Sequence, residues 1–161
     1  MSEQPSLRRK DKAVTNRRQL DEIIRGSLVC RLALAKDNSP YLVPLSFGYD
    51  GAFIYLHTAT VGKKIEYWKT NGQVCFEFER NVELRRNANN ACKWSFAFES
   101  VIGYGTISEV TDTAAKEDAL NEIMRQYSGK VWPFEEDSVA KVRVWKIKIG
   151  SMTGKHSELK P

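Results

Sequence analysis

Residues suited to chemistry lie close together near the middle of the chain. A β-like run ends at His57 and Thr58, and Gly62 precedes Lys63 and Lys64 where a helical pattern begins. Lysine side chains and free backbone N–H groups at a helix start can bind an anion, and an imidazole can exchange protons near neutral pH. The same residues also fit a solvated helix start and a hydrogen-bonded histidine at a strand end. The sequence alone leaves both interpretations open.

A predicted β-hairpin over residues 40–58 leads to these residues. Asp50 and Gly51 lie between two apolar runs, a pair typical of a tight turn in which both central residues have positive φ. Strand side chains alternate between faces, so the first run has a predicted core face and a second face that suits a flat ligand. The core face is Val43, Leu45, Phe47 and Tyr49, and the second face is Leu42, Pro44, Ser46 and Gly48.

The composition is that of a globular protein. The 161 residues are 42% hydrophobic and 28% charged. A single domain of this size buries roughly two thirds of its unfolded surface. No apolar run approaches the ~18 residues needed to span a bilayer, and residues 1–16 lack the apolar segment of a secretory signal. We therefore expect no membrane association and a cytoplasmic location.

The net charge of +5 is concentrated near the N-terminus. Residues 1–18 hold six basic and two acidic side chains, whereas the other 143 residues carry a balance of only +1. A solvated basic arm over residues 1–15 is favoured over a nucleic-acid-binding arm. A nucleic-acid-binding β-barrel is therefore the last-ranked hypothesis, and we expect no nucleic-acid partner.

The cysteines and histidines do not indicate a metal site. The three cysteines form no C-x-x-C pair, and Cys30 and Cys75 lie in apolar runs where a free thiol behaves as a small hydrophobic group. The two histidines have no ligand spacing. We expect no bound metal.

Periodicity predicts three helices and six strands. The helices cover 16–25, 61–70 and 112–127, and the strands cover 28–36, 40–49, 52–58, 73–79, 94–110 and 139–149. Predicted inner faces include Leu28, Cys30, Leu32 and Leu34 in the first strand and Val61, Ile65 and Trp68 in the second helix. The pattern has no βαβ alternation. It predicts an α+β, mainly β fold, a six-stranded antiparallel barrel with short flanking helices.

Smaller features complete this prediction. Residues 87–90 and 129–137 are predicted loops, and residues 150–161 a polar tail. Gly103 and Gly105 inside a strand indicate a barrel bend more than a phosphate loop. The apolar parity of the last strand switches between Val144 and Trp145, which predicts a bulge or burial on both faces.

Four segments in this order carry a resemblance to a known family. They are Arg-Arg-Lys-Asp-Lys at 8–12, Val-Pro-Leu-Ser-Phe-Gly-Tyr at 43–49, Leu-His-Thr-Ala-Thr-Val-Gly-Lys-Lys at 56–64 and Ser-Val-Ile-Gly-Tyr-Gly at 100–105. The chain resembles the FMN-binding split barrels related to pyridoxamine 5′-phosphate oxidase, nearest to the Nim-type nitroimidazole-resistance proteins. The resemblance implies an FMN-binding split-barrel domain over 16–150 and a tail, 151–161, that contributes to the site.

The resemblance also implies roles for single residues. Lys63 and Lys64, with His57 or Thr58, would hold the FMN phosphate and ribityl chain. Pro44, Leu45, Ser46 and Phe47 would lie along the isoalloxazine ring through backbone groups. Ser100 and Val101 would approach the flavin from the partner subunit of a homodimer, and Lys155 belongs to the closing motif at 151–155.

The sequence departs from the family pattern in two places. Lysine stands at the phosphate position where arginine is frequent, which keeps the charge but loses the bidentate fork. The arginine- and tryptophan-bearing C-terminal segment of true pyridoxamine phosphate oxidases has no counterpart here, so oxidation of that substrate is not expected.

The leading hypothesis is a homodimeric FMN-dependent oxidoreductase that reduces a small nitroaromatic or quinone-like acceptor. His57 is the candidate catalytic residue, as a proton donor or a substrate contact. The alternative is a non-catalytic module that binds flavin or haem on the same barrel.

Overall fold

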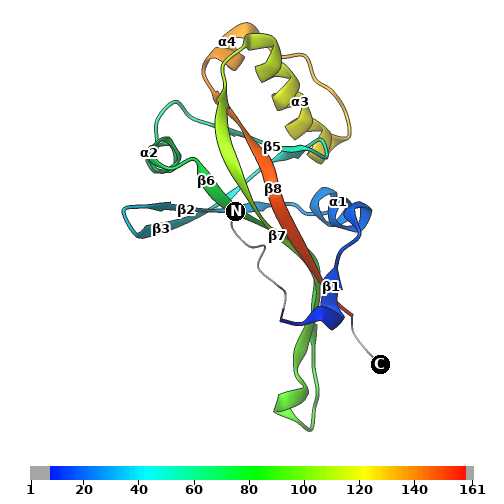
Figure 1. Cartoon of the computed structure of the whole chain (residues 1–161). Helices are drawn as coiled ribbons and strands as arrows, with labels where there is room; N and C mark the ends of the chain where they lie inside the picture. Colours follow the sequence, from blue (N-terminus) through cyan, green and yellow to red (C-terminus); the bar gives the residue numbers. More distant parts are fainter. Residues whose placement is uncertain (1–7, 159–161) are drawn as a thin grey trace.

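The computed structural model describes residues 8–158, and its strands form one antiparallel sheet (Figure 1). The sheet has eight strands in the order β3-β2-β6-β7-β8-β5-β4, and β1 pairs with β8 outside this path. The strands are β1 (Ala13–Val14), β2 (Cys30–Lys36), β3 (Ser39–Leu45), β4 (Gly48–Tyr49), β5 (Phe53–Thr58), β6 (Gln73–Arg85), β7 (Ser95–Val110) and β8 (Arg143–Ser157).

Four α-helices and two short 3-10 helices accompany the sheet in the described residues. They are η1 (Lys10–Lys12), α1 (Arg17–Arg25), α2 (Lys63–Thr70), η2 (Ala91–Lys93), α3 (Thr113–Ser128) and α4 (Glu136–Ala140). The predicted α+β, mainly β class is confirmed. The predicted number of six strands is wrong, because the first run of the hairpin divides into β3 and β4 and because β1 adds a strand near the N-terminus.

The barrel is split where β3 passes into β4. These two strands are the ends of the sheet path, yet only Ser46 and Phe47 separate them in the chain. The turn after β4 centres on Gly51, whose φ is 100°, while the Asp50 carboxylate accepts hydrogen bonds from the N–H groups of Ala52 and Phe53 at 2.7 Å each. The prediction of positive φ at Asp50 is therefore wrong, since Asp50 stabilises the turn through its side chain.

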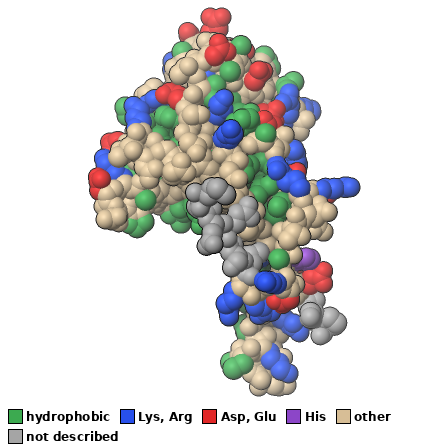
Figure 2. Space-filling view, viewed as in Figure 1, with side chains coloured by type: hydrophobic (Ala, Val, Ile, Leu, Met, Phe, Trp, Pro, Cys, Tyr) green, Lys and Arg blue, Asp and Glu red, His purple; other side chains and the backbone are tan. Residues whose placement is uncertain are grey.

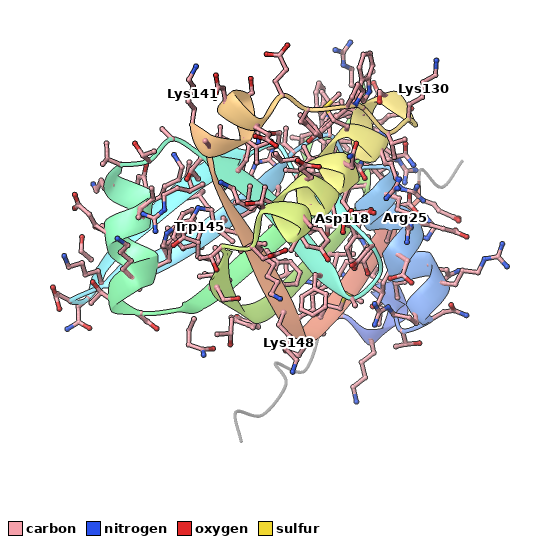
Figure 3. All side chains as sticks on the ribbon, turned by 90° about the horizontal axis from the view of Figure 1, so that it is seen from above. Arg25, Asp118, Lys130, Lys141, Trp145 and Lys148 are labelled. Atoms are coloured by element: carbon pink, nitrogen blue, oxygen red, sulfur yellow. The ribbon has the colours of Figure 1, made fainter. Side chains whose placement is uncertain are left out.

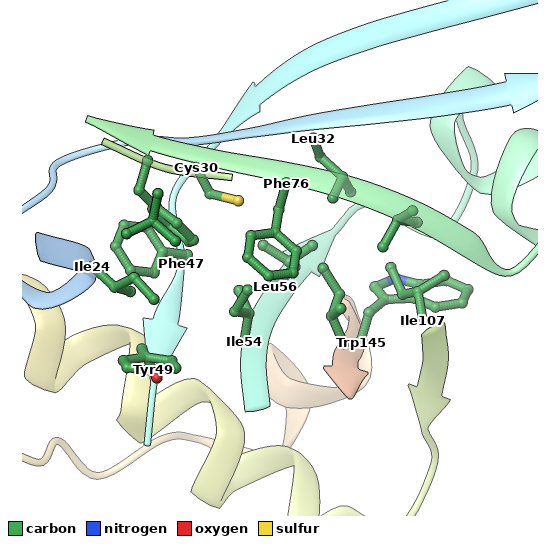
Figure 4. Close-up of a cluster of buried hydrophobic side chains, with 14 of the residues drawn as sticks. Ile24, Cys30, Leu32, Phe47, Tyr49, Ile54, Leu56, Phe76, Ile107 and Trp145 are labelled. Atoms are coloured by element: carbon green, nitrogen blue, oxygen red, sulfur yellow. The ribbon is translucent and has the colours of Figure 1, made fainter. Parts of the chain in front are cut away.

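The barrel interior is filled by large apolar side chains from every side (Figure 4). Its fully buried members include Cys30, Leu32, Phe47, Ile54, Leu56, Phe76, Phe78, Val101 and Ile147. The rings of Phe47 and Phe78 lie 4.7 Å apart between centroids, as do those of Trp68 and Trp145. The predicted core face of residues 43–49 is confirmed, most strongly by Phe47 and Tyr49.

A second cluster lies outside the barrel, under α3 and α4. It contains Val110, Ala119, Leu120, Ile123, Val139 and Val144. Val144 and Trp145 are both buried because β8 has a core on each of its faces here, which confirms burial on both faces rather than a bulge at this step. The register shift lies between Tyr104 and Gly105 instead, opposite Gly150.

The glycines of β7 mark a bend. A Cβ atom at Gly103 would lie 2.3 Å from the Phe76 ring, so only glycine lets the strand approach this side chain. No helix opens after Gly105, because β7 continues to Val110. The barrel-bend interpretation is confirmed.

Several predicted boundaries are wrong for the same reason. The first or last residue of the helix or strand does not coincide with the end of the apolar pattern from which it was predicted. Leu28 is 76% exposed and Val61 81% exposed, because β2 begins at Cys30 and α2 at Lys63. The polar tail expected after Ile149 is strand up to Ser157, since β7 pairs with it along its whole length. Residues 129–137 include the start of α4, and β6 continues past Glu79 to Arg85.

The basic arm is described only from Arg8 onward. Lys12 donates from Nζ to the Ser157 hydroxyl at 2.8 Å, and Ala13 and Val14 pair with Lys155 and Gly154. The expectation of a solvated arm therefore does not hold for Lys12–Val14, which are attached to β8.

Candidate functional site

The split of the barrel brings three elements together. β5 ends at Thr58, the chain turns through residues 59–62, and α2 begins at Lys63. The Lys63 ammonium lies over the ring of Tyr41 in β3, 4.8 Å from its centroid. The start of α2 is thus held against β3, the strand at the open edge of the sheet.

The N-terminus of α2 has no side-chain cap. Its N-cap is Gly62, and only the N–H groups of Ile65 and Glu66 return to the Gly62 carbonyl, at 2.9 and 3.3 Å. The first N–H groups of a helix have no partner within the helix. Gly62 has a φ of 154°, and a Cβ atom there would meet no neighbour. Glycine is therefore favoured at this position by the backbone conformation and not by a lack of space. The N–H groups of Lys63 and Lys64 are thus available to a ligand.

The two lysines bring positive charge to this end of α2. Lys63 is exposed and also lies 5.7 Å from the centroid of the Tyr67 ring, whereas Lys64 is half-buried. Among residues 8–158 neither lysine has a carboxylate within ion-pair distance. An anion could therefore approach both ammonium groups without displacing a carboxylate.

His57 and Thr58 point to opposite faces of β5. His57 is exposed on the outer face, and partial burial lowers the pKa of its imidazole below the ordinary 6.5 because desolvation penalises the charged form. Thr58 is buried, accepts a hydrogen bond from Trp145 Nε1 at 3.0 Å and donates to the Ala59 carbonyl at 2.8 Å. The single hydroxyl proton of Thr58 is thus already used and cannot be donated to a phosphate while this bond holds.

The Pro44–Phe47 segment is only partly open to a ligand. Pro44 and Ser46 are exposed, but the Phe47 side chain is fully buried. The Phe47 N–H group donates to the Tyr127 hydroxyl at 3.1 Å, so this backbone group already has a partner. Within residues 8–158 β3 pairs only with β2, which leaves alternate backbone groups on its other edge without a strand partner there. That edge, together with Ser46, is the part of the segment available to a ligand.

Ser100, Val101 and Lys155 lie in a different part of the molecule. Ser100 is opposite Lys155 in the β7–β8 register, close to the pairing of β1 with β8, while α2 packs against β2 (Figure 1). The Val101 side chain is fully buried, so only its backbone could meet a ligand. The predicted residues therefore form two groups in one chain, one at the split and one on β7 and β8.

Three residues at the split were missed by sequence reasoning. Tyr41 contacts Lys63, Trp145 binds Thr58, and Arg143 is the register partner of Thr58. Arg143 donates to the Thr60 carbonyl at 3.4 Å while its guanidinium is paired with Glu109, so it supports the loop before α2. Tyr41 is two residues before the predicted core face of Val43, Leu45, Phe47 and Tyr49 and continues its alternation, which was a usable signal. No local pattern connects residues 143–145 with residues 58–60.

The site is an open surface in a single chain. Two hollows of 520 and 490 Å³ lie elsewhere, the first beside Arg9, Arg85 and His156 and the second between α1 and the Gly150 region of β8. Among residues 8–158, no three His, Cys, Asp or Glu side chains gather as metal ligands would. No helix in the same residues is both long and apolar enough to cross a membrane. The arrangement at the split has the chemistry to attract an anionic group to the start of α2, beside the free edge of β3.

Comparisons with known proteins give one family match and several similar structures. The family model described as pyridoxamine 5′-phosphate oxidase matches residues 16–156. A 5-nitroimidazole antibiotic resistance protein from Bacteroides thetaiotaomicron, so described from its crystal structure, is 30% identical, with a TM-score of 0.79 over 89% of this chain and 85% of that one. No curated protein matches the sequence.

More distant solved structures share the fold. An FAD- and haem-binding protein from Mycobacterium smegmatis has a TM-score of 0.81 at 20% identity, over 93% of this chain and 75% of that one. An FAD-binding protein from Mesorhizobium loti has a TM-score of 0.65 at 21% identity, over 91% of this chain and 98% of that one.

Proposed function

Because the chain belongs to the pyridoxamine 5′-phosphate oxidase family, we propose that it binds FMN and acts as a homodimeric FMN-dependent oxidoreductase on a small nitroaromatic or quinone-like acceptor. The observation that carries the proposal is the uncapped N-terminus of α2, with Lys63 and Lys64, beside the unpaired edge of β3. This arrangement fits a phosphate dianion followed by a flat, hydrogen-bonding ring.

The residues of this chain would divide the binding between them. Lys63, Lys64 and their backbone N–H groups would hold the phosphate, and the free edge of β3 near Ser46 would hydrogen-bond the ring. Bound FMN supplies the electron transfer to the acceptor. The protein would position the flavin, and the buried Thr58–Trp145 hydrogen bond fixes the end of β5, from which residues 59–62 lead to α2.

The second group of residues supports a dimer. Ser100, the Val101 backbone and Lys155 would approach the flavin of the partner subunit, because in one chain they lie apart from α2. The outer face of the sheet also exposes apolar side chains. Leu42 is 61% exposed, Ile102 44% and Tyr104 46%, a patch that a second copy would cover.

His57 is proposed to act on the acceptor. The imidazole is exposed, and its lowered pKa favours the neutral form at pH 7, which suits a hydrogen-bond contact to the acceptor or the relay of a proton taken from solvent. His57→Ala should leave flavin bound and depress turnover. Unchanged turnover would remove His57 from the mechanism.

A non-catalytic role in flavin or haem binding is the second candidate. The similarity in fold to the M. smegmatis protein favours it, because that protein is described as binding both FAD and haem. Absence of steady-state reduction with reduced nicotinamides and a panel of acceptors would support this role.

A visible absorption spectrum of the purified protein, before and after addition of FMN and desalting, tests the proposal. We expect a retained flavin spectrum. A protein that never retains FMN would overturn the proposal, and a Soret band would replace it with the haem-binding alternative.

A further inference from the structure

The two ends of the molecule differ in charge, and both expose aromatic side chains. One end is the outer part of the β6–β7 hairpin, residues 81–98, here called the arm, which projects beyond the rest of the sheet at the foot of Figure 1. The other end is the loop after α3 together with α4, residues 129–140, here called the acidic end, at the top of the same view.

The arm is fixed at its base, where Phe98 also pairs with Ser157 of β8, and it exposes apolar side chains farther out. Arg80 pairs with Glu99 and donates to the Glu22 carbonyl of α1 at 2.8 Å, and Asn81 donates to Glu99 at 2.6 Å. Beyond this base the ribbon has two strands, an arrangement with marginal stability of its own. Its exposed apolar residues are Val82 at 50%, Leu84 at 43%, Trp94 at 48% and Phe96 at 52%.

The arm is basic overall. Arg85, Arg86 and Lys93 lie toward its tip, and its one acidic residue, Glu83, lies near its base. Figure 2 shows basic and apolar side chains together on this part of the molecule. A two-stranded ribbon that carries aromatic rings among cations suits a partner surface that is acidic and apolar.

The acidic end provides such a surface. Glu135, Glu136 and Asp137 are consecutive and exposed, next to Val131 at 59% and Trp132 at 49% exposure. Acidic side chains are prominent over α3 and α4 in Figure 2, and Figure 3 shows Lys130 and Lys141 at the margins of this region.

We propose that the arm of one protomer packs on the acidic end of a second copy, in an antiparallel two-fold dimer. The proposal deepens the homodimer of the proposed function and depends on it. Because the complementary surfaces lie at opposite ends of one chain, a two-fold axis across the long direction forms the same contact twice. A parallel pairing would instead place like charges together. Ser100 lies near the base of the arm, so this contact continues the face that is proposed to meet the partner's flavin.

A charge swap tests the arrangement. Arg86→Glu with Lys93→Glu reverses the arm, and Glu135→Lys with Glu136→Lys reverses the acidic end; all four side chains are exposed. Each variant alone should dimerise at least about tenfold more weakly than the wild type at low salt, because both copies of the contact become repulsive. Mixed in equal amounts, the two variants should form heterodimers in large excess over the statistical half, since both contacts are then attractive. Native mass spectrometry distinguishes the species.

The control is Arg18→Glu with Lys69→Glu, which changes the net charge as much as the arm variant at exposed positions on α1 and α2. Circular dichroism verifies the fold of each variant. A statistical mixture, unchanged dimerisation of either variant or a monomeric wild type would overturn the proposal, as would an arm that binds nucleic acid in the monomer. Flavin absorbance of the same samples separates the outcomes. A colourless dimer whose charge-reversed variants form excess heterodimer would refute only flavin binding. A yellow dimer whose variants form no excess heterodimer would refute only this contact.

Discussion

At α1 and α3 a side chain of the same molecule holds the first backbone N–H groups, whereas at α2 none does. Asn16 accepts from the N–H groups of Arg18 and Gln19 at 2.9 and 3.4 Å, and Asp112 accepts from that of Ala115 at 2.9 Å. At α2 the corresponding position is Gly62. Two helix starts are therefore capped by a side chain of the fold, whereas α2, like the short α4, has no such cap.

The difference separates stabilising polar groups from binding ones. A side-chain cap contributes about 1 kcal/mol to stability because it satisfies a donor that water would otherwise solvate. The uncapped α2 forgoes that contribution and leaves its donors and Lys63 and Lys64 open to an anion. The Thr58 hydroxyl belongs with the stabilising groups, because it accepts a hydrogen bond from Trp145 and donates one to the Ala59 carbonyl.

The largest expected effect is at α2. Replacing Lys63 and Lys64 together by alanine should weaken FMN binding by about 100-fold, since two charge-assisted hydrogen bonds to the phosphate are lost. Titration of the apoprotein with FMN, followed by flavin fluorescence, measures the change. Arg18→Ala with Lys69→Ala removes the same charge from exposed positions and should not alter affinity. An equal loss of FMN affinity in the Lys63/Lys64 and Arg18/Lys69 variants would mean that the net charge of the protein, and not the start of α2, determines the effect.

Thr58→Val tests the engaged hydroxyl. The substitution leaves the buried Trp145 Nε1 group without its acceptor, and an unsatisfied buried donor costs about 2 kcal/mol of unfolding free energy. Denaturant unfolding measures this loss. FMN affinity should change little, because the threonine proton already serves Ala59. A loss of FMN affinity as large as that of the Lys63/Lys64 variant would contradict this prediction and would indicate that Thr58 binds the ligand.

The sequence was informative where a pattern is local. Alternation in residues 43–49 identified Phe47 and Tyr49 as core, and Asp112 was recognisable as the start of α3 because a cap and its helix are adjacent in the chain. Lys63 and Lys64 were likewise visible as a basic helix start. Each of these predictions depends on neighbours within a few residues.

The remaining features depend on partners far along the chain. The strand from Gly150 to Ser157 has no apolar alternation and exists because β7 pairs with it. The Thr58 hydroxyl is engaged by Trp145, 87 residues away. The separation of Ser100 and Lys155 from α2 follows from the order of strands in the sheet, which local periodicity does not encode.

A smaller effect is expected at the capped helices. Asn16→Ala and Asp112→Ala should each lower the unfolding free energy by about 1 kcal/mol, because backbone donors at the start of α1 or α3 lose their acceptor. FMN affinity should stay as in the wild type. Thermal unfolding and FMN titration on the same samples measure both quantities. If either variant lost flavin as the lysine variant does, the contrast between capped and uncapped helix starts would not hold.

The smallest expected effect concerns pH and His57. The folded structure lowers the pKa of this imidazole, so below about pH 6.5 the unfolded chain takes up a proton more readily than the folded one. The stability that depends on neutral His57 is therefore present above this pH and is lost as the pH falls through the folded pKa. Unfolding free energies between pH 7 and about pH 5.5 should decline less steeply in His57→Gln than in the wild type. His156→Gln, at an exposed position on β8, is the matched control. Identical slopes for the wild type and His57→Gln would contradict this prediction. They would mean that folding does not change the pKa of His57 and that its side chain, unlike that of the buried Thr58, is fully solvated.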